Sequence, residues 1–333
     1  MNNCVKNQTV LVTGADGFIG SHLVERLVSD GASVRALVYY NSWNSLGWLS
    51  EIPIETLEKC DVVFGDIRDS EFILELVKDC SYVFHLSSLI GIPFSYVAPR
   101  SYVETNVIGA LNVLEACRKS ASLQRLIHVS TSEVYGSAQT VPIAESHPLV
   151  GQSPYSASKI GADHLVDSYF RSFSLPMVIA RPFNTFGPRQ TARAVIPAIA
   201  TQLIAGCNEL KMGALTPTRD FNFVTDTVAG LLALAACEAA LGKTINIGSG
   251  EEWSIEKTAK MLMEICGVEV PIVSDEDRLR PLKSEVNRLV ADNQLLQDLT
   301  GWQRCVDFET GLRLTVEWIR KNQTHFGFSR YAI

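Results

Sequence analysis

The sequence predicts an α/β fold, with a doubly wound parallel sheet followed by a smaller C-terminal α/β substrate-binding lobe. Three observations predict it. Near the N-terminus a glycine-rich turn joins an apolar run to a helical pattern. Strand and helix patterns then alternate through the first half. After residue 181 this regular alternation ends in a segment interrupted by prolines. Such alternation is typical of a parallel sheet that helices cover on both faces. At 333 residues, one compact unit or two closely joined domains is expected.

The glycine turn forms the first strand–helix unit. The apolar segment 10–13 ends at Gly14, two more glycines follow at steps of three, and a helical apolar pattern begins. Glycine permits a turn that a Cβ would block and lets backbone amides approach a diphosphate, which the positive end of the new helix also favours. This context predicts a Rossmann-type dinucleotide site. Its expected cofactor contacts are Gly14, Asp16, Gly17, Phe18, Ile19 and Gly20.

The remaining elements follow in order. Strands are expected over 34–39, 61–64, 81–86, 126–130 and 177–181, and helices over 102–119 and 155–173. After a proline-punctuated loop, helices are expected over 198–205, 255–266 and 308–321, and a strand over 244–247. We assign residues 1–181 to a dinucleotide-binding domain. Residues 182–333 are assigned mainly to a substrate-binding lobe, with some segments returning to the first domain.

Composition narrows the function classes. A net charge of −7 provides no general basic surface, so no nucleic-acid partner is expected. The eight cysteines form no CxxC or Cys/His cluster, which predicts no metal site and buried free thiols in a reducing compartment. The N-terminus lacks the apolar core of a signal peptide, and the apolar segment 228–241 is too short to span a bilayer and carries Glu238. We therefore expect a cytoplasmic protein without a membrane partner.

The end of the second strand bears on the choice of cofactor. In NAD-binding sheets an acidic residue there normally binds the ribose 2′-hydroxyl. Segment 34–42 has neither an acid at that place nor a basic residue after the strand to hold a 2′-phosphate. Asn41 and Ser42 can hydrogen-bond either form. NAD is favoured, and NADP stays open.

A candidate chemical centre combines two motifs. Thr131 and Glu133 follow the strand at 126–130, while Tyr155 and Lys159 lie four residues apart on one helical face. A phenol with a pKa near ~10 is a poor base at neutral pH. A neighbouring ammonium group and a positive nicotinamide ring favour its ionised form, and Lys159 can also hold the cofactor ribose.

Together with the glycine turn, these motifs resemble the extended short-chain dehydrogenase/reductase superfamily over nearly the whole chain, in its sugar-nucleotide epimerase/dehydratase branch. The resemblance implies that Tyr155 deprotonates a sugar 4-hydroxyl, that the cofactor takes the C4 hydride and that Thr131 binds the hydroxyl. Asp66 matches an adenine-contacting turn, although an Asx turn explains it equally well. The other cofactor positions implied are Ile67, Leu86, Ser87, Ser88, Asn106, Ser130, Tyr155, Lys159 and Arg181.

Glu133 distinguishes reactions within this family. Simple 4-epimerases usually lack it, whereas a 4,6-dehydratase needs a base for the C5 proton and an acid for the C6 hydroxyl. Glucose-type dehydratases carry Thr-Asp-Glu, but this chain has Ser132 in the middle. Thr-Ser-Glu occurs in GDP-mannose 4,6-dehydratases, so Glu133 would serve as both base and acid, and also in UDP-glucuronate decarboxylases. A decarboxylase or a 4-epimerase therefore remains the alternative. A non-catalytic regulator of this fold would typically lack Tyr155 or Lys159.

Three stretches favour one substrate class. Residues 39–49, 153–163 and 215–224 look like the dehydratases of bacterial legionaminic-acid synthesis. That resemblance implies a nucleotide-linked N-acetylhexosamine, N-acetylglucosamine first, carried by UDP or GDP. The expected substrate contacts are Asn184, Val195, Arg219 and Arg280, with Arg278 as the alternative to Arg280. Helices at 102–119 and 155–172 match the pair that forms a homodimer interface in relatives.

Overall fold

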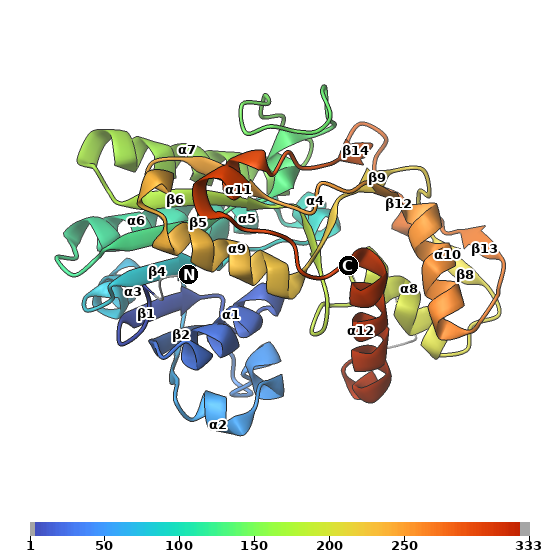
Figure 1. The fold of residues 1–333 in the computed structure, drawn as a ribbon, viewed down its shortest axis with the longest axis horizontal. Coiled ribbons are helices and arrows are strands. Elements are labelled where there is room, and N and C mark those ends of the chain that lie inside the picture. The colour runs from blue at the N-terminus through green and yellow to red at the C-terminus, as the bar shows by residue number, and fades with distance from the viewer. Residues whose placement is uncertain (1–3, 327–333) are drawn as a thin grey trace.

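A seven-stranded sheet forms the centre of the first body in the computed structural model, which describes residues 4–326 (Figure 1). Every neighbouring pair of strands in it is parallel. The strands lie in the order β11 (Thr244–Ile247), β6 (Met177–Pro182), β5 (Arg125–Val129), β4 (Tyr82–His85), β1 (Thr9–Thr13), β2 (Ser33–Tyr39) and β3 (Asp61–Gly65).

Both faces of this sheet are apolar. Val10 and Val12 of β1 belong to one buried cluster, whereas Leu11 belongs to the cluster on the opposite face. Because successive side chains of a strand point to opposite faces, a continuous apolar run requires cover on both. Helices α1 (Phe18–Ser29), α9 (Val224–Ala236) and α11 (Gln294–Thr300) cover one face, and α3 (Ser70–Val77), α6 (Gly109–Lys119) and α7 (Pro154–Phe173) cover the other.

The strand order sets the position of the ligand crevice. From β1 the chain continues to β2 and β3 on one side, and then returns to β4, β5 and β6 on the other side. Ligands bind at such a reversal, outside the carboxyl ends of the strands. The glycine turn follows β1 at that point, and the predicted doubly wound fold is confirmed.

A second body packs on the carboxyl edge of the sheet (Figure 1). Its core lies among α8 (Val195–Ile204), α10 (Ile255–Cys266) and α12 (Phe308–Lys321). Three small sheets join it. They are β7 (Asn184–Phe186) with β10 (Phe221–Phe223), β8 (Leu210–Met212) with β13 (Ile272–Ser274), and β9 (Thr218–Arg219) between β12 (Trp253–Ser254) and β14 (Arg288–Leu289).

Later parts of the chain return to the first body. Helix α9 packs on α1, strand β11 pairs with β6, and α11 packs on α9. These elements follow residue 181 in sequence yet cover or extend the large sheet. The division after residue 181 stays a prediction.

Two predicted helices differ in detail. The helix predicted over 102–119 is built as α5 (Pro99–Tyr102), a π-helical segment (Val103–Ile108) and α6. Helix α8 begins at Val195, three residues before the prediction, because Pro197 lies in its first turn, where a missing N–H costs nothing. Short elements complete the chain: η1 (Gly47–Glu51), α2 (Ile54–Leu57), α4 (Ile92–Val97), η3 (Ser132–Tyr135), η4 (Glu238–Ala240), η5 (Glu276–Arg278) and η6 (Gln323–His325).

All eight cysteines are free, but the prediction that they are buried holds fully only for Cys80 and Cys117, and Cys305 is exposed. Within residues 4–326, no three His, Cys, Asp or Glu side chains are grouped so that they could hold a metal ion. Every helix in that range is too short or too polar to cross a membrane.

Candidate active site

A cavity of about 1090 Å³ lies between the carboxyl edge of the large sheet and the second body. The first body lines it with the glycine turn and with the ends of strands β2 to β6. The second body contributes the start of α8, residues near β8 and β9, and the segment that follows η5. Both bodies therefore build one site.

The glycine turn leaves no room for side chains. Gly14 has a φ of +69°, and a Cβ on it would lie 2.9 Å from the backbone nitrogen of Ser87. A Cβ on Gly20 would lie 2.1 Å from the carbonyl oxygen of Gly14. Helix α1 begins directly after Gly17, and a helix N-terminus favours an anion, so this cradle fits a dinucleotide diphosphate. All residues predicted here line the cavity: Gly14, Asp16, Gly17, Phe18, Ile19 and Gly20.

The turn after β3 also lines the cavity, with Asp66 and Ile67. The Asp66 carboxylate accepts a hydrogen bond from the Arg68 amide at 2.9 Å, which makes an Asx turn, and it pairs with the Arg68 guanidinium at 2.5 Å. That guanidinium holds the pKa of Asp66 below its usual range. Asp69, not Asp66, caps α3. Asp66 therefore forms an Asx turn and also lines the cavity, so the turn and the adenine contact are compatible.

The turn after β4 is tied to the first strand. The Thr13 hydroxyl oxygen accepts hydrogen bonds from the amides of Leu86 and Ser87, each at 3.1 Å. Leu86, Ser87 and Ser88 all line the cavity beside the glycine turn. The structure therefore brings these predicted cofactor residues together.

The end of β2 differs from the prediction. Asn41 and Ser42 are not among the lining residues. The Asn41 side chain instead closes its own loop, donating to the carbonyls of Tyr39 and Ser45 and accepting from the Ser45 amide. The carboxylate at this place comes from Asp16, whose Oδ2 accepts from the Tyr39 amide at 3.3 Å. A search for an acid along β2 alone misses it, because Asp16 lies in the glycine turn.

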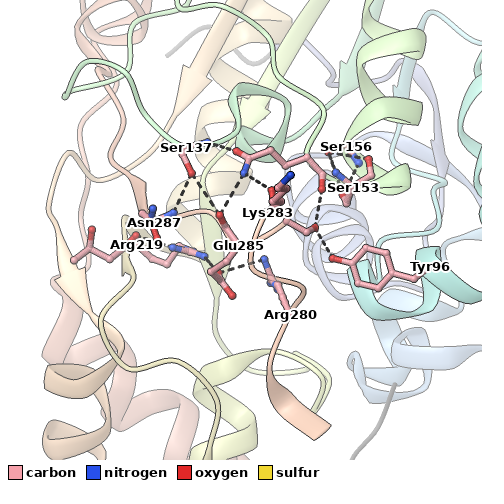
Figure 2. A network of polar contacts seen from close by, with 12 residues as sticks. Tyr96, Ser137, Ser153, Ser156, Arg219, Arg280, Lys283, Glu285 and Asn287 are labelled. Atoms are coloured by element: carbon pink, nitrogen blue, oxygen red, sulfur yellow. Dashed lines mark hydrogen bonds and ion pairs between the residues drawn. The ribbon is translucent and has the colours of Figure 1, made fainter. Parts of the chain in front are cut away.

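The predicted reactive groups meet at the end of β5. Thr131 caps η3 by accepting from the Glu133 amide at 3.2 Å, and Ser130, Ser132 and Glu133 line the cavity beside it. Tyr155 enters from the first turn of α7, whose start is fixed by a capping box of Ser153 and Ser156 (Figure 2) and by Pro154. The structure therefore places a phenol, a hydroxyl and a carboxylate in one cavity wall.

Burial controls the proton affinities of the two groups on α7. It raises the pKa of the Tyr155 phenol, which a hydrogen bond with Thr131 partly offsets. It lowers the pKa of Lys159 to about 8, against the opposing effect of Asp163. Lys159 does not line the cavity; its Nζ donates to the carbonyl oxygen of Val129 at 2.9 Å. The expected lowering of the Tyr155 pKa by Lys159 stays a prediction.

Two predicted cofactor residues lie behind the cavity wall. Arg181 is buried, and its guanidinium pairs with Asp163 at 2.9 Å and donates to the Tyr135 hydroxyl at 3.0 Å. Asn106 is buried in the π-helical segment, where its side chain bonds the backbone of Leu89 and the hydroxyl of Ser158. Neither residue lines the cavity and each side chain is bonded within the protein, so a direct cofactor contact from either one stays a prediction.

The predicted substrate residues line the opposite wall. Asn184 begins β7, and among the described residues its buried Oδ1 has no hydrogen-bond partner. Val195 begins α8. Arg219 is buried, which lowers its pKa, while the charge of Glu133 acts in the opposite direction. Arg280 lines the same wall, so both arginines predicted to bind the substrate border the cavity.

Glu285 was missed by the sequence reasoning. Its carboxylate lies between the two arginines, 3.3 Å from Arg219 and 3.9 Å from Arg280 (Figure 2). Arg278, the alternative to Arg280, pairs instead with Asp275 at 3.0 Å. In the sequence, the one indication of a role for Glu285 is its position five residues after Arg280. Only the fold shows that Glu285 contacts Arg219.

Known proteins resemble this chain over nearly their whole length. A dTDP-glucose 4,6-dehydratase of Actinoplanes is 34% identical over 95% of this chain and 98% of that protein. A dTDP-glucose 4,6-dehydratase of Streptomyces venezuelae, solved with NAD bound, superposes with a TM-score of 0.82 at 30% identity, covering 95% of this chain and 98% of that one. The UDP-glucuronic acid 4-epimerase of Bacillus cereus, solved with NAD and UDP-glucuronic acid, gives 0.85 at 29%, covering 94% and 99%.

The family model described as GDP-mannose 4,6 dehydratase matches residues 11–315, which include the glycine turn, the Thr-Ser-Glu triplet and the helix with Tyr155 and Lys159. The chain belongs to this family, within the extended short-chain dehydrogenases of the NAD-dependent epimerase/dehydratase type.

Proposed function

We propose that this protein is an NAD-dependent 4,6-dehydratase of a nucleotide-linked N-acetylhexosamine, N-acetylglucosamine first. The observation that carries the proposal is Glu133, a carboxylate that shares one cavity wall with Tyr155 and Thr131. A 4-epimerase has no use for a second base at that position. Relatives named 4,6-dehydratases support the reaction class.

Tyr155 performs the first proton transfer. Its phenolate takes the proton of the sugar 4-hydroxyl, which Thr131 orients by hydrogen bonding. When held at the glycine turn, NAD would supply the acceptor for the C4 hydride and the donor of that hydride to C6. Lys159 holds a positive charge behind the phenol, anchored on the Val129 carbonyl, and this charge favours the phenolate.

Glu133 performs the step that defines the reaction. The new C4 ketone acidifies the C5–H bond, Glu133 takes that proton, and the electron pair forms the C5–C6 double bond as the C6–O bond breaks. Glu133 then delivers that proton to the departing hydroxyl, which leaves as water. As the hydride adds to C6, C5 takes up a solvent-derived proton through Glu133. Overall the sugar loses the elements of one water and its C4 hydrogen moves to C6, and the 4-hydroxyl proton released from Tyr155 balances the proton taken up at C5.

The opposite wall suits a sugar nucleotide. Arg219 and Arg280 present guanidinium groups that match the geometry of a diphosphate, and the unpartnered Asn184 adds a polar contact. The N-acetylhexosamine specificity rests on the resemblance of stretches 39–49, 153–163 and 215–224. UDP and GDP are the two candidate carriers.

Asp16 supports NAD rather than NADP. Its carboxylate lies at the end of β2, where an acid normally binds the ribose 2′-hydroxyl. Arg68, which lines the same cavity, is already paired with Asp66 and lies 3.9 Å from Glu104. A 2′-phosphate would therefore meet the carboxylates of Asp16 and Asp66, while the charge of Arg68 is already paired. The wild type should bind NADP+ more weakly than NAD+. Asp16→Asn is expected to lower the ratio of the NADP+ dissociation constant to the NAD+ dissociation constant by about tenfold, measured by titration calorimetry.

The reaction is tested in D2O with NAD and each of UDP-N-acetylglucosamine, GDP-N-acetylglucosamine and UDP-glucuronate. A dehydratase gives a 4-keto-6-deoxy product that has lost the mass of one water and carries deuterium at C5. Release of CO2 from UDP-glucuronate indicates the decarboxylase alternative, and a C4 epimer indicates an epimerase.

We also propose that the enzyme is a cytoplasmic homodimer. Val103 is 49% exposed and Ile108 42% exposed on the segment leading into α6, and Phe173 is 52% exposed at the end of α7. These apolar side chains belong to the two helices that form the dimer interface in relatives. Light scattering after size-exclusion chromatography measures the mass, and a monomer would contradict this proposal.

A further inference from the structure

Residues 280–287, here called the strap, cross from the second body to the cavity wall and carry Arg280 and Glu285 into the site. Part of the hydrogen bonding of the strap backbone is local, since the amides of Ser284 and Glu285 donate to the carbonyl of Pro281. The strap enters a sheet only at its end, where β14 begins. Its position over the cavity therefore depends strongly on side-chain contacts with the first body.

Gln152 of the first body makes two of these contacts. Its Nε2 donates to the carbonyl oxygens of Lys283 at 3.2 Å and Glu285 at 3.3 Å. Its Oε1 accepts from the Ser137 amide at 2.5 Å. A Cβ on Gly136 would lie 2.5 Å from that same Oε1, so the turn at Gly136 is shaped to admit this side chain.

The backbone carbonyl of Gln152 also contacts the strap. The Ser284 hydroxyl donates to the Gln152 carbonyl at 2.6 Å and lies 2.6 Å from the Tyr96 hydroxyl, which belongs to α4 and lines the cavity. Ser137 adds a weaker bond to the Glu285 carbonyl at 3.5 Å. Figure 2 shows the strap residues Lys283 and Glu285 between Arg219 on the left and Tyr96 on the right, with Ser137 above Arg219.

The position of Gln152 in the chain links the strap to the reactive helix. It directly precedes Ser153, the N-cap of α7, which presents Tyr155 two residues later. We propose that Gln152 is a positioning residue: it fixes the strap so that Glu285 stays between Arg219 and Arg280, and it sets that anion-binding wall at a fixed place relative to Tyr155. The inference rests on the proposed function, in which the two arginines bind the nucleotide diphosphate.

Gln152→Ala tests this inference in the full-length protein. UDP and GDP are first titrated into the wild type by calorimetry, and the tighter binder serves as the probe. Loss of two donors to neutral carbonyls is expected to weaken that binding, and to raise the KM of the matching N-acetylglucosamine nucleotide, by about tenfold. The kcat value should change less than about threefold and the NAD dissociation constant should stay unchanged, because neither Tyr155 nor the glycine turn is touched.

Two variants separate this role from a general structural one. Gln152→Glu keeps the acceptor for Ser137 but loses both donors, so it should behave like the alanine variant. Gln139→Ala removes an exposed side chain of the same type on the neighbouring loop and should leave UDP, GDP and NAD binding unchanged. Amide hydrogen exchange of Ser284 and Glu285 should also accelerate in Gln152→Ala.

The outcomes that overturn the inference are distinct. Wild-type nucleotide binding and wild-type strap exchange in Gln152→Ala, or full function in Gln152→Glu, would show that these donors do not hold the strap. Equal losses of NAD and nucleotide affinity would show a general structural defect instead. If the wild type itself bound neither UDP nor GDP, the proposed function would fall, and this inference with it.

Discussion

The ammonium group of Lys159 donates a hydrogen bond to the carbonyl oxygen of Val129 at 2.9 Å, which ties α7 to the end of β5. The lysine is almost fully buried, and burial lowers its pKa to about 8. The Tyr155–Lys159 pair therefore loses its first proton near that pH, and loss from the phenol gives the phenolate that the ammonium charge favours.

The active form pairs the Tyr155 phenolate with the Lys159 ammonium group and has one proton fewer than the acid form, so kcat/KM should rise with pH and level off above about 8. Lys159→Met keeps the length of the side chain without the charge. Its low residual activity should therefore go on rising into the alkaline range, because only the phenol, whose pKa burial raises, has to ionise. The profiles of both proteins are measured by product formation across neutral and alkaline buffers. A wild-type profile that is flat from neutral pH upward, or that matches the profile of the variant, would contradict a role for the Lys159 charge.

Gly20→Ala should damage both the cofactor site and the fold. Its Cβ would lie 2.1 Å from the Gly14 carbonyl oxygen, so the turn must open. We expect a loss of about 3 kcal/mol in the free energy of unfolding, measured with urea, and a large loss of NAD affinity. Gly206→Ala is the matched control: its φ is +74° but nothing lies within 4 Å, so it should cost about 1 kcal/mol and leave NAD binding intact.

Arg181 should be a stability residue rather than a cofactor ligand. Arg181→Gln leaves the buried Asp163 carboxylate without its guanidinium partner, which costs about 3–5 kcal/mol. Adding Asp163→Asn removes the uncompensated charge and should recover part of this loss. Urea unfolding measures both variants. Weaker NAD binding in Arg181→Gln with unchanged stability would restore the original prediction that Arg181 binds the cofactor.

The sequence was sufficient where chemistry and backbone geometry are local. Gly14 and Gly20 are required by a turn of few residues, and Tyr155, Thr131 and Glu133 stand in short motifs at strand or helix ends. These residues line the cavity as predicted. Each motif could be recognised because the residues that its geometry requires lie within a few positions of one another.

Contacts between distant segments could not be found in this way. Asp16 was expected to contact the cofactor from the glycine turn, but only the fold brings its carboxylate to the end of β2, and Glu285 meets Arg219 although 66 positions separate them. The pairing of Arg181 with Asp163 could not be predicted either. In β6 the neighbouring Ala180 packs on the α9 face, so Arg181 points to the opposite face, toward Asp163 of α7.

The role of Glu133 is tested most directly by Glu133→Gln in a single turnover with N-acetylglucosamine nucleotide and enzyme-bound NAD in D2O. We predict that oxidation at C4 still occurs, so that NADH absorbance rises and persists, while C5 takes up no deuterium and water loss slows by at least about a hundredfold. Normal dehydration with full deuterium at C5 would contradict the assignment of Glu133 as the base.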